Sequence, residues 1–214
     1  MSTVTGVITI DGPAASGKSS SAELLARAYG VPHISSGLLY RLVAHLAIGT
    51  ETDLHDGPAL VAMCQEFRVQ LDATPDGNRV MVNGRDLTEH VTTEAVDNVV
   101  SFVARLPEVR EWVNERLREI PTPFVIDGRD MGTAVFTDAQ WKFYLTADAR
   151  VRAERRQRER GESVAEIERA LIARDELDKK QSAPAPDAIH IDGSQRSLHE
   201  VVQAMRQYIE EPAA

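Results

Sequence analysis

The sequence predicts an α/β fold in which a parallel β-sheet is covered by helices on both faces. Short apolar segments typical of buried strands alternate with amphipathic segments along most of the chain. Because parallel strands need a crossover connection, which is usually a helix, this alternation favours a parallel sheet. A glycine-rich loop between the first strand and the first helix supports the same class. One region, residues 67–84, departs from the pattern and predicts a separate antiparallel element.

The elements of the predicted sheet follow from hydrophobic periodicity. Residues 4–10 form the first strand, and apolar side chains then recur at helical spacing from Lys18 to Ala28. A second strand ends just before Ser36. Three more apolar strands, at 124–126, 142–145 and 188–191, bring the predicted sheet to five strands. The last helix begins at a capping box, in which Ser197 precedes Glu200 by three residues.

The region that departs from this pattern predicts a small antiparallel meander. Apolar and polar residues alternate on both sides of a turn expected at 74–78, and Asn83-Gly84 is a second tight-turn pair. A helix with a valine-rich face follows, and Pro107 suits the first turn of the next helix. We therefore expect an inserted subdomain at 62–106 and a core domain made of 1–61 and 107–214.

Composition narrows the class of protein. The chain has 214 residues, a formal net charge of −9 and a single cysteine, Cys64. These values favour an ordinary globular, cytoplasmic protein and argue against a dedicated nucleic-acid binder, an internal disulfide or a thiolate metal cage. We find no apolar run long enough for a membrane span and no signal peptide. The six histidines have no metal-site spacing, and we expect Cys64, Trp112 and Trp141 to be packing residues.

Residues 12–19 satisfy the phosphate-loop pattern G-x-x-x-x-G-K-[ST], between a strand and a helix as that motif requires. Glycines allow several backbone N–H groups to point at one anion, and the helix N-terminus adds its positive end. Lys18, the only lysine in the first 141 residues, supplies a charge for the β- and γ-phosphates. The predicted ATP-binding residues here are Gly12, Pro13, Ala14, Ala15, Ser16, Gly17, Lys18, Ser19 and Ser20.

A carboxylate at the end of a buried strand predicts the metal ligand that accompanies such a loop. Asp127 closes the strand at 124–126. With the Ser19 hydroxyl it forms the predicted Mg²⁺ site, either directly or through a water ligand. The alternative is an ordinary acid at a strand end.

Six arginines between residues 150 and 160 face only two acids, so this segment carries a local charge of +4 in an acidic protein. The competing interpretation is a solvated helix face with i,i+4 ion pairs. Because the acids are too few to pair every arginine, we expect a polyanionic ligand, as phosphoryl transfer requires.

Two further strings make the prediction more specific. Ser36-Gly37-Leu38-Leu39-Tyr40-Arg41 follows the second strand, and Asp127-Gly128-Arg129-Asp130-Met131-Gly132-Thr133 follows the third. Together with the phosphate loop they closely resemble the bacterial cytidylate kinases, from about residue 5 to residue 208. The resemblance implies a P-loop NTPase-type five-stranded sheet, an enlarged nucleoside-monophosphate-binding insertion and a short helical lid at about 150–178. It also implies ATP and Mg²⁺ as cofactors, CMP or dCMP as substrate, and a monomer.

The resemblance also implies roles for individual residues. Ser36, Ser101, Arg110 and Asp130 would recognise cytosine, and Arg41 and Arg129 would hold the CMP phosphate. Arg174 and Asp178 would lie near the ribose and phosphate, and Arg152, Arg155 and Arg156 would be the lid arginines over ATP. In this assignment the groups closest to the reaction are Lys18, Arg129, Arg155 and Arg174.

The chemistry of the base agrees with that assignment. Cytosine offers an N4 amino donor next to the N3 and O2 acceptors, which suits a carboxylate and an arginine. Uracil would turn an O4 acceptor toward Asp130, and two buried acceptors facing each other are penalised. Asp130 and Arg129 could instead form only a surface ion pair, and Ser101 could be a simple helix hydroxyl.

Three positions depart from the family pattern. Ser35 stands where an acid is common, Gln181 stands where many members have a phosphate-holding arginine, with Lys180 next to it, and the 182–186 loop is short. A kinase of another monophosphate such as UMP, a P-loop kinase of a non-nucleotide metabolite, and a non-catalytic nucleotide switch remain as alternatives.

Overall fold

The computed structural model describes residues 4–74, 77–160, 163–178 and 182–211. It divides into two compact units, one made of Met1–His33 and Thr122–Ala214 and the other of Ile34–Pro121. In the part of the chain that the structure describes, no helix is long and apolar enough to cross a membrane.

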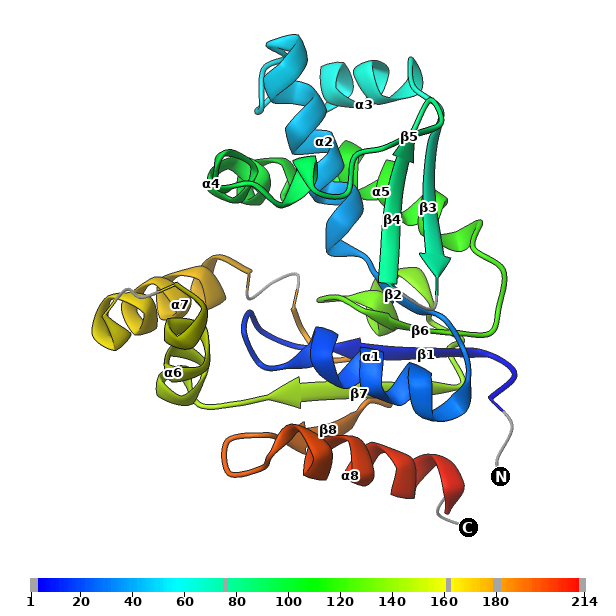
Figure 1. Ribbon diagram of the computed structural model, residues 1–214, viewed down its shortest axis with the longest axis vertical. Helices are drawn as coiled ribbons and strands as arrows, with labels where there is room; N and C mark the ends of the chain where they lie inside the picture. The colour runs from blue at the N-terminus through cyan, green and yellow to red at the C-terminus, as the bar shows by residue number, and fades with distance from the viewer. Residues whose placement is uncertain (1–3, 75–76, 161–162, 179–181, 212–214) are drawn as a thin grey trace. The chain divides into compact units, whose positions relative to one another are not determined.

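The first unit is built on the predicted five-stranded sheet (Figure 1). Its strand order is β2-β6-β1-β7-β8, and β1 pairs in parallel with both β6 and β7, as β7 does with β8. In chain order the strands are β1 (Val7–Asp11), β2 (His33–Ser35), β6 (Phe124–Asp127), β7 (Trp141–Thr146) and β8 (Ile189–Asp192). The predicted α/β class is therefore confirmed.

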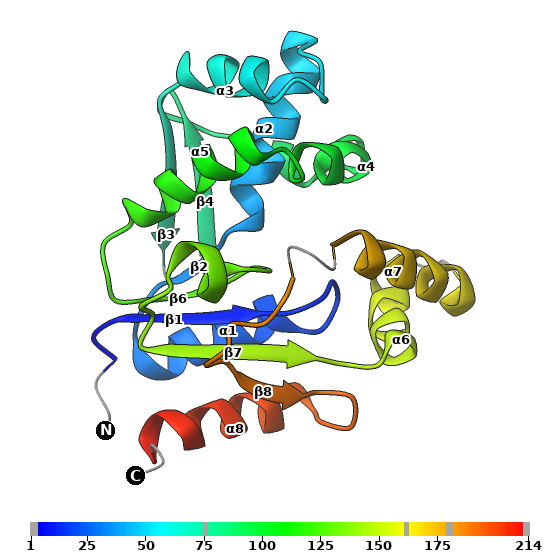
Figure 2. The same ribbon diagram turned by 180° about the vertical axis from the view of Figure 1, so that it is seen from behind.

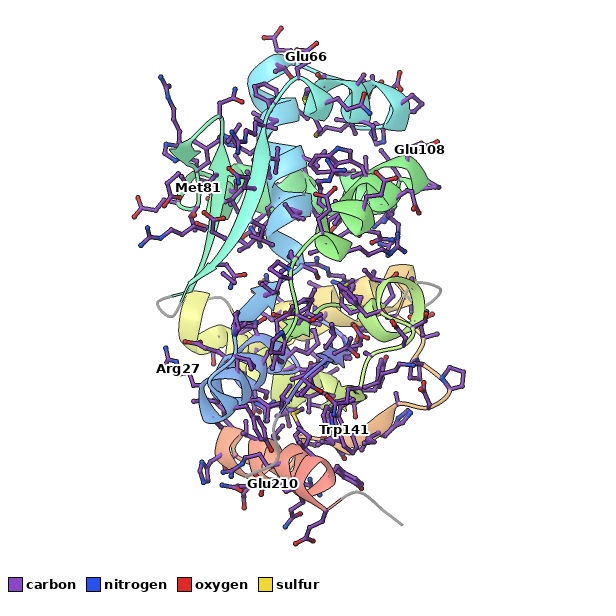
Figure 3. The ribbon with its side chains drawn as sticks, turned by 90° about the vertical axis from the view of Figure 1, so that its right-hand side faces the viewer. Arg27, Glu66, Met81, Glu108, Trp141 and Glu210 are labelled. Carbon is purple, nitrogen blue, oxygen red and sulfur yellow. The ribbon has the colours of Figure 1, made fainter. Side chains whose placement is uncertain are left out.

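Helices α1 (Lys18–Tyr29) and α8 (Leu198–Glu210) pack against this sheet and each other. Their apolar faces join β1, β7 and β8 in one core cluster that includes Leu25, Phe143 and Met205. Trp141 packs at its edge, as predicted (Figure 3). The Ser197 capping box at the start of α8 is also confirmed, since each partner binds a backbone N–H of the other.

Two helices lie side by side beyond the sheet, α6 (Ala149–Arg160) and α7 (Val164–Asp178), and they span the segment predicted as a lid (Figures 1 and 2). Ala153, Ile167 and Leu171 form their small shared core. A short π-helical segment, η2 (Met131–Val135), lies between β6 and β7. Such segments are rare and are frequent at functional sites.

The second unit contains the predicted meander as a three-stranded antiparallel sheet of β3 (Val69–Thr74), β4 (Gly77–Val82) and β5 (Arg85–Asp86). The Asn83-Gly84 turn is confirmed, with φ values of 50° and 79°. Of the turn predicted at 74–78, residues 75–76 lie outside the described part. The helices of this unit are α2 (Gly37–Thr50), α3 (Gly57–Gln65), η1 (His90–Thr92), α4 (Glu94–Val103) and α5 (Pro107–Arg118).

The second unit is wider than the 62–106 insertion expected from sequence. Helix α2 packs on α3, α4 and α5, and α3 packs on α5, so the helices flanking the meander share its compact unit. Pro107 begins α5 as predicted, and Trp112 is buried. Cys64 on α3 is 1% exposed, and burial raises the pKa of its thiol to about 12.

Candidate active site

The phosphate loop connects the end of β1 to the start of α1 in the first unit. Gly12, Ala15 and Gly17 have φ values of 146°, 59° and 95°, so the backbone curls through conformations that favour glycine. A Cβ on Gly12 would lie 2.1 Å from the carbonyl oxygen of Leu145 on β7. Gly17 has no side chain to cap the first turn of α1, whose N–H groups can therefore bind an anion.

Lys18 is held against the loop that contains it. Its Nζ donates to the carbonyl oxygen of Pro13 at 2.7 Å. Burial lowers the pKa of the ammonium to about 8, while the carboxylates of Asp127 and Asp11 act in the opposite direction and the charges of Arg129 and Arg174 act in the same one. These four charged groups therefore lie close enough to act on the charge of Lys18, and Arg129 and Arg174 are, with Lys18, three of the four residues that were predicted to lie closest to the reaction.

The predicted metal ligands contact each other directly. The Ser19 hydroxyl donates to Oδ2 of Asp127 at 2.8 Å, and Asp127 lies on β6 opposite Ile10 of β1. Asp127 Oδ1 lies 2.7 Å from Nε2 of His33 on β2. A hydroxyl and a carboxylate are oxygen donors that suit Mg²⁺, which otherwise takes water and substrate phosphate oxygens. Over the described ranges no group of three or more His, Cys, Asp or Glu could hold a metal by itself.

A cavity of about 640 Å³ opens beside the phosphate loop. Its volume is in the range of small-molecule sites. Its lining combines the loop, the start of α1, two arginines of α6 and the segment that leads into α8. The lining residues are Ala15, Ser16, Gly17, Lys18, Ser19, Ser20, Ser21, Arg155, Arg156, Arg196, Ser197, Leu198 and Val201.

The loop at 128–133 is anchored to the end of β1. The backbone N–H groups of Met131 and Gly132 donate to Oδ1 and Oδ2 of Asp11, each at 2.8 Å. Asp11 is buried, and that burial raises the pKa of its carboxyl to about 6 even though both N–H groups favour the charged form. Arg129 and Asp130 directly precede the two anchored amides, and Asp130 is itself buried.

The predicted substrate residues of the second unit come from three helices. Arg41 of α2 pairs with Asp97 of α4 and donates to the carbonyl oxygen of Val91 at 3.3 Å. The guanidinium of Arg110 on α5 lies over the ring of Tyr40, 5.7 Å from its centroid. The remaining two are the buried Ser36, which precedes α2, and Ser101 on α4.

Comparisons with known proteins identify the family of this chain. Residues 8–211 match the family described as cytidylate kinase. The cytidylate kinase of Thermus thermophilus is 56% identical over 197 residues, covering 92% of this chain and 95% of that protein. The chain belongs to the cytidylate kinase family.

Other relatives are consistent with that family. The cytidylate kinase of Deinococcus radiodurans is 54% identical over 196 residues, covering 92% of this chain and 95% of its own. A crystal structure of an uncharacterized protein from Eubacterium ventriosum shares the fold, with a TM-score of 0.53 at 13% identity, over 96% of this chain and 98% of that one.

The residues predicted from the cytidylate kinase resemblance are distributed over both units. Ser36, Arg41, Ser101 and Arg110 belong to Ile34–Pro121, whereas Arg129, Asp130, Arg174 and Asp178 belong to the unit with the phosphate loop. Asp178 is the last residue of α7, and its side chain lies outside the described part. Lys180 and Gln181 lie outside it as well.

The three lid arginines expected for a cytidylate kinase have different surroundings. Arg155 and Arg156 line the cavity, and Arg155 donates to the carbonyl oxygens of Ser16 at 3.3 Å and Gly193 at 2.7 Å. Arg152 is 4% exposed and is absent from the lining residues. It donates to the carbonyl oxygens of Ala147 and Ala14 and pairs with Asp175 of α7. Arg152 therefore connects α6, α7 and the phosphate loop.

The expectation that the 150–160 arginines lack partners is wrong for Arg150 and Arg152. Arg150 pairs with Glu154 on its own helix and Glu168 on α7, and Arg152 pairs with Asp175. Glu168 and Asp175 belong to α7, so counting charges within residues 150–160 missed them. The side chains of Arg158 and Arg160 lie outside the described part.

Sequence reasoning also missed two contacts in the site. His33 was set aside with the other histidines, yet it contacts Asp127, and Asp11, directly before the phosphate-loop pattern, was given no role. Nothing in the local sequence identifies either contact, because each depends on which strand or loop lies beside the residue in the folded sheet.

Proposed function

We propose that this member of the cytidylate kinase family transfers the γ-phosphoryl group of ATP to the phosphate of CMP or dCMP, giving ADP and CDP or dCDP. The bond from the γ-phosphorus to the β–γ bridging oxygen breaks, and a bond to an acceptor phosphate oxygen forms. The observation that carries the proposal is the cluster of Lys18, Arg129 and Arg174 at the phosphate loop. Two guanidinium groups that act on one ammonium suit a reaction in which two phosphate groups meet.

In-line transfer needs little more than positioning and charge. The acceptor phosphate is already an anion near neutral pH, so no general base is required and we assign none. Lys18 would follow the phosphoryl group from the donor side, and Arg129 and Arg174 would hold the acceptor side. Bound phosphate would favour the charged form of Lys18, whose pKa is lowered in the chain alone.

Ser19 and Asp127 would hold Mg²⁺, which supplies charge neutralisation for the β- and γ-phosphate oxygens when bound. The contact of Asp127 with His33 supports this role, since a carboxylate fixed by a second partner is oriented before it binds a cation. Arg155 and Arg156 would contact ATP in the cavity they line, and closure of α6 and α7 would exclude water and prevent hydrolysis of ATP. For Arg152, its buried contacts favour support of the loop over contact with ATP.

For the acceptor we propose the roles that the family resemblance implies. We assign the base to Ser36, Ser101, Arg110 and Asp130, the phosphate to Arg41 and Arg129, and the ribose with its phosphate to Arg174 and Asp178. The burial of Asp130 supports its role in recognising the base. A buried carboxylate has lost its hydrogen bonds to water, so a base that cannot donate a hydrogen bond to it is penalised.

The test is an ADP-release assay with CMP, dCMP, UMP and AMP as acceptors, repeated with Asp130→Asn. We expect CMP and dCMP to be preferred and the preference over UMP to fall about tenfold or more in the variant, because an amide can turn either a donor or an acceptor toward the base. Preference for UMP or AMP in the unaltered chain would overturn the proposal. Slow ATP hydrolysis that no acceptor accelerates would favour a nucleotide switch.

A further inference from the structure

Asp11 is a buried acid that the proposed mechanism does not use. It is the last residue of β1, directly before the phosphate loop, and it is 5% exposed. A buried carboxylate is costly unless its oxygens accept hydrogen bonds. Both oxygens of Asp11 accept a hydrogen bond, and the two donors are the consecutive backbone N–H groups of Met131 and Gly132.

The geometry of the contact restrains the loop at 128–133 in two directions. Oδ1 and Oδ2 accept from the consecutive amides of Met131 and Gly132, so the carboxylate fixes both the position and the orientation of that backbone. Gly132 also packs closely on the same strand, because a Cβ added to it would lie 2.9 Å from Oγ1 of Thr9. The loop is therefore held against β1 by a bidentate contact and by close packing.

The anchored amides directly follow the residues assigned to the acceptor. Asp130 has φ −145° and ψ 28°, outside the helical and strand regions, and its carbonyl oxygen accepts from the N–H of Ala134 at 2.8 Å. The backbone of Asp130 is thus bonded to η2, and the first two amides of η2 are in turn held by Asp11. A shift of the Met131 amide would move the Asp130 carboxylate and, through the preceding peptide, Arg129.

We propose that Asp11 is a positioning residue, which sets base selectivity by fixing Asp130 and sets acceptor affinity by fixing Arg129. This inference rests on the proposed function, because it takes its effect from the roles of those two residues. A purely structural carboxylate would instead stabilise the fold and leave selectivity unchanged.

The test is Asp11→Asn, which keeps the size of the side chain but turns an NH₂ group toward one of the two N–H donors. We expect the ratio of kcat/KM for CMP to that for UMP to fall about tenfold, and KM for CMP to rise about tenfold, since one charge-assisted hydrogen bond is lost and one donor is opposed. KM for ATP should change less than KM for CMP, because Lys18 keeps its hydrogen bond to Pro13 and loses only one of the charges that act on it. Asp53→Asn is the matched control: Asp53 is an exposed carboxylate that also accepts a backbone N–H, from His55, and all three parameters should remain unchanged.

If Asp11→Asn does not fold, as judged by circular dichroism, Gly132→Ala decides the same question by displacing the loop from the Thr9 side. It should also lower CMP selectivity while sparing KM for ATP. A folded Asp11→Asn protein with unchanged selectivity and unchanged KM for CMP would overturn the inference and leave the proposed function intact. Failure of the proposed function itself would appear in the unaltered chain, as a lack of preference for CMP.

Discussion

The phosphate loop and the acceptor-binding residues of Ile34–Pro121 hold their charged side chains in different ways. Residues 12–19 are contiguous, and their conformation follows from glycines and from one strand–helix junction. Arg41 and Arg110 come from different helices and are oriented by Asp97 and Tyr40, side chains that helix packing brings near them. A short motif therefore encodes the conformation of the phosphate loop, whereas the surroundings of Arg41 and Arg110 depend on how α2, α4 and α5 pack.

The largest expected effect lies in the phosphate loop. Lys18→Ala removes the central charge, and kcat should fall on the order of 10²–10³-fold, as is typical when one preorganised stabilising group is lost. The coupled ADP-release assay measures it. Arg27→Ala, which removes an exposed cation of the same helix that pairs with Glu23, should keep full activity. Normal activity of Lys18→Ala would contradict a catalytic loop.

Because Asp11 is buried at the end of β1, we expect the stability of the chain to depend on pH. Burial raises the pKa of Asp11 from 3.8 to about 6, so between these values the folded chain binds more protons than the unfolded chain. The free energy of unfolding should therefore fall as pH rises through this window, by up to about 3 kcal/mol relative to Asp11→Asn, at about 1.4 kcal/mol per pKa unit. Urea unfolding of both proteins at pH 4, 5, 6 and 7 measures the difference, and a difference that stays constant with pH would exclude this coupling.

Close packing of the loop can be broken without any change in charge. Gly12→Ala places a Cβ 2.1 Å from a backbone oxygen of β7, so the loop must shift, at a cost of about 1–3 kcal/mol. We expect a lower Tm and at least a tenfold higher KM for ATP. Gly49→Ala in α2 is the control, because a Cβ there meets nothing within 4 Å, and it should be neutral or slightly stabilising. Equal behaviour of the two variants would show that the Leu145 contact does not constrain the loop.

Substitution of a residue assigned to the CMP phosphate should have a smaller effect than substitution of Lys18, and it should change KM for CMP and not KM for ATP. Arg41→Ala removes one of the cations assigned to the CMP phosphate, and KM for CMP should rise about tenfold while KM for ATP stays within about twofold. Arg116→Ala, which removes another arginine of the same unit that pairs with Glu119, should leave both values unchanged. A rise in KM for ATP equal to that for CMP would remove the distinction between the two sides.

The features that could be predicted from the sequence are those encoded by a short motif, and the features that could not are those that depend on packing. The loop, the strand that ends at Asp127, the capping box of α8 and the meander were all predicted, because each is encoded by neighbours along the chain. The partners that Asp11, His33 and Arg152 find in other segments of the fold were not predicted, because they lie 23 to 138 residues away. The wider second unit was missed for the same reason, since packing between helices determines its limits.

The burial of Cys64 has a practical consequence. Its thiol is covered and protonated at neutral pH, whereas thiol-specific dyes and mild oxidants react with exposed thiolates. The native chain should therefore remain unlabelled while it is folded. A cysteine introduced on the exposed side of α7, by Ala165→Cys, would then carry a fluorophore at a single position, and its emission could follow this helix as ATP binds without removal of the native cysteine.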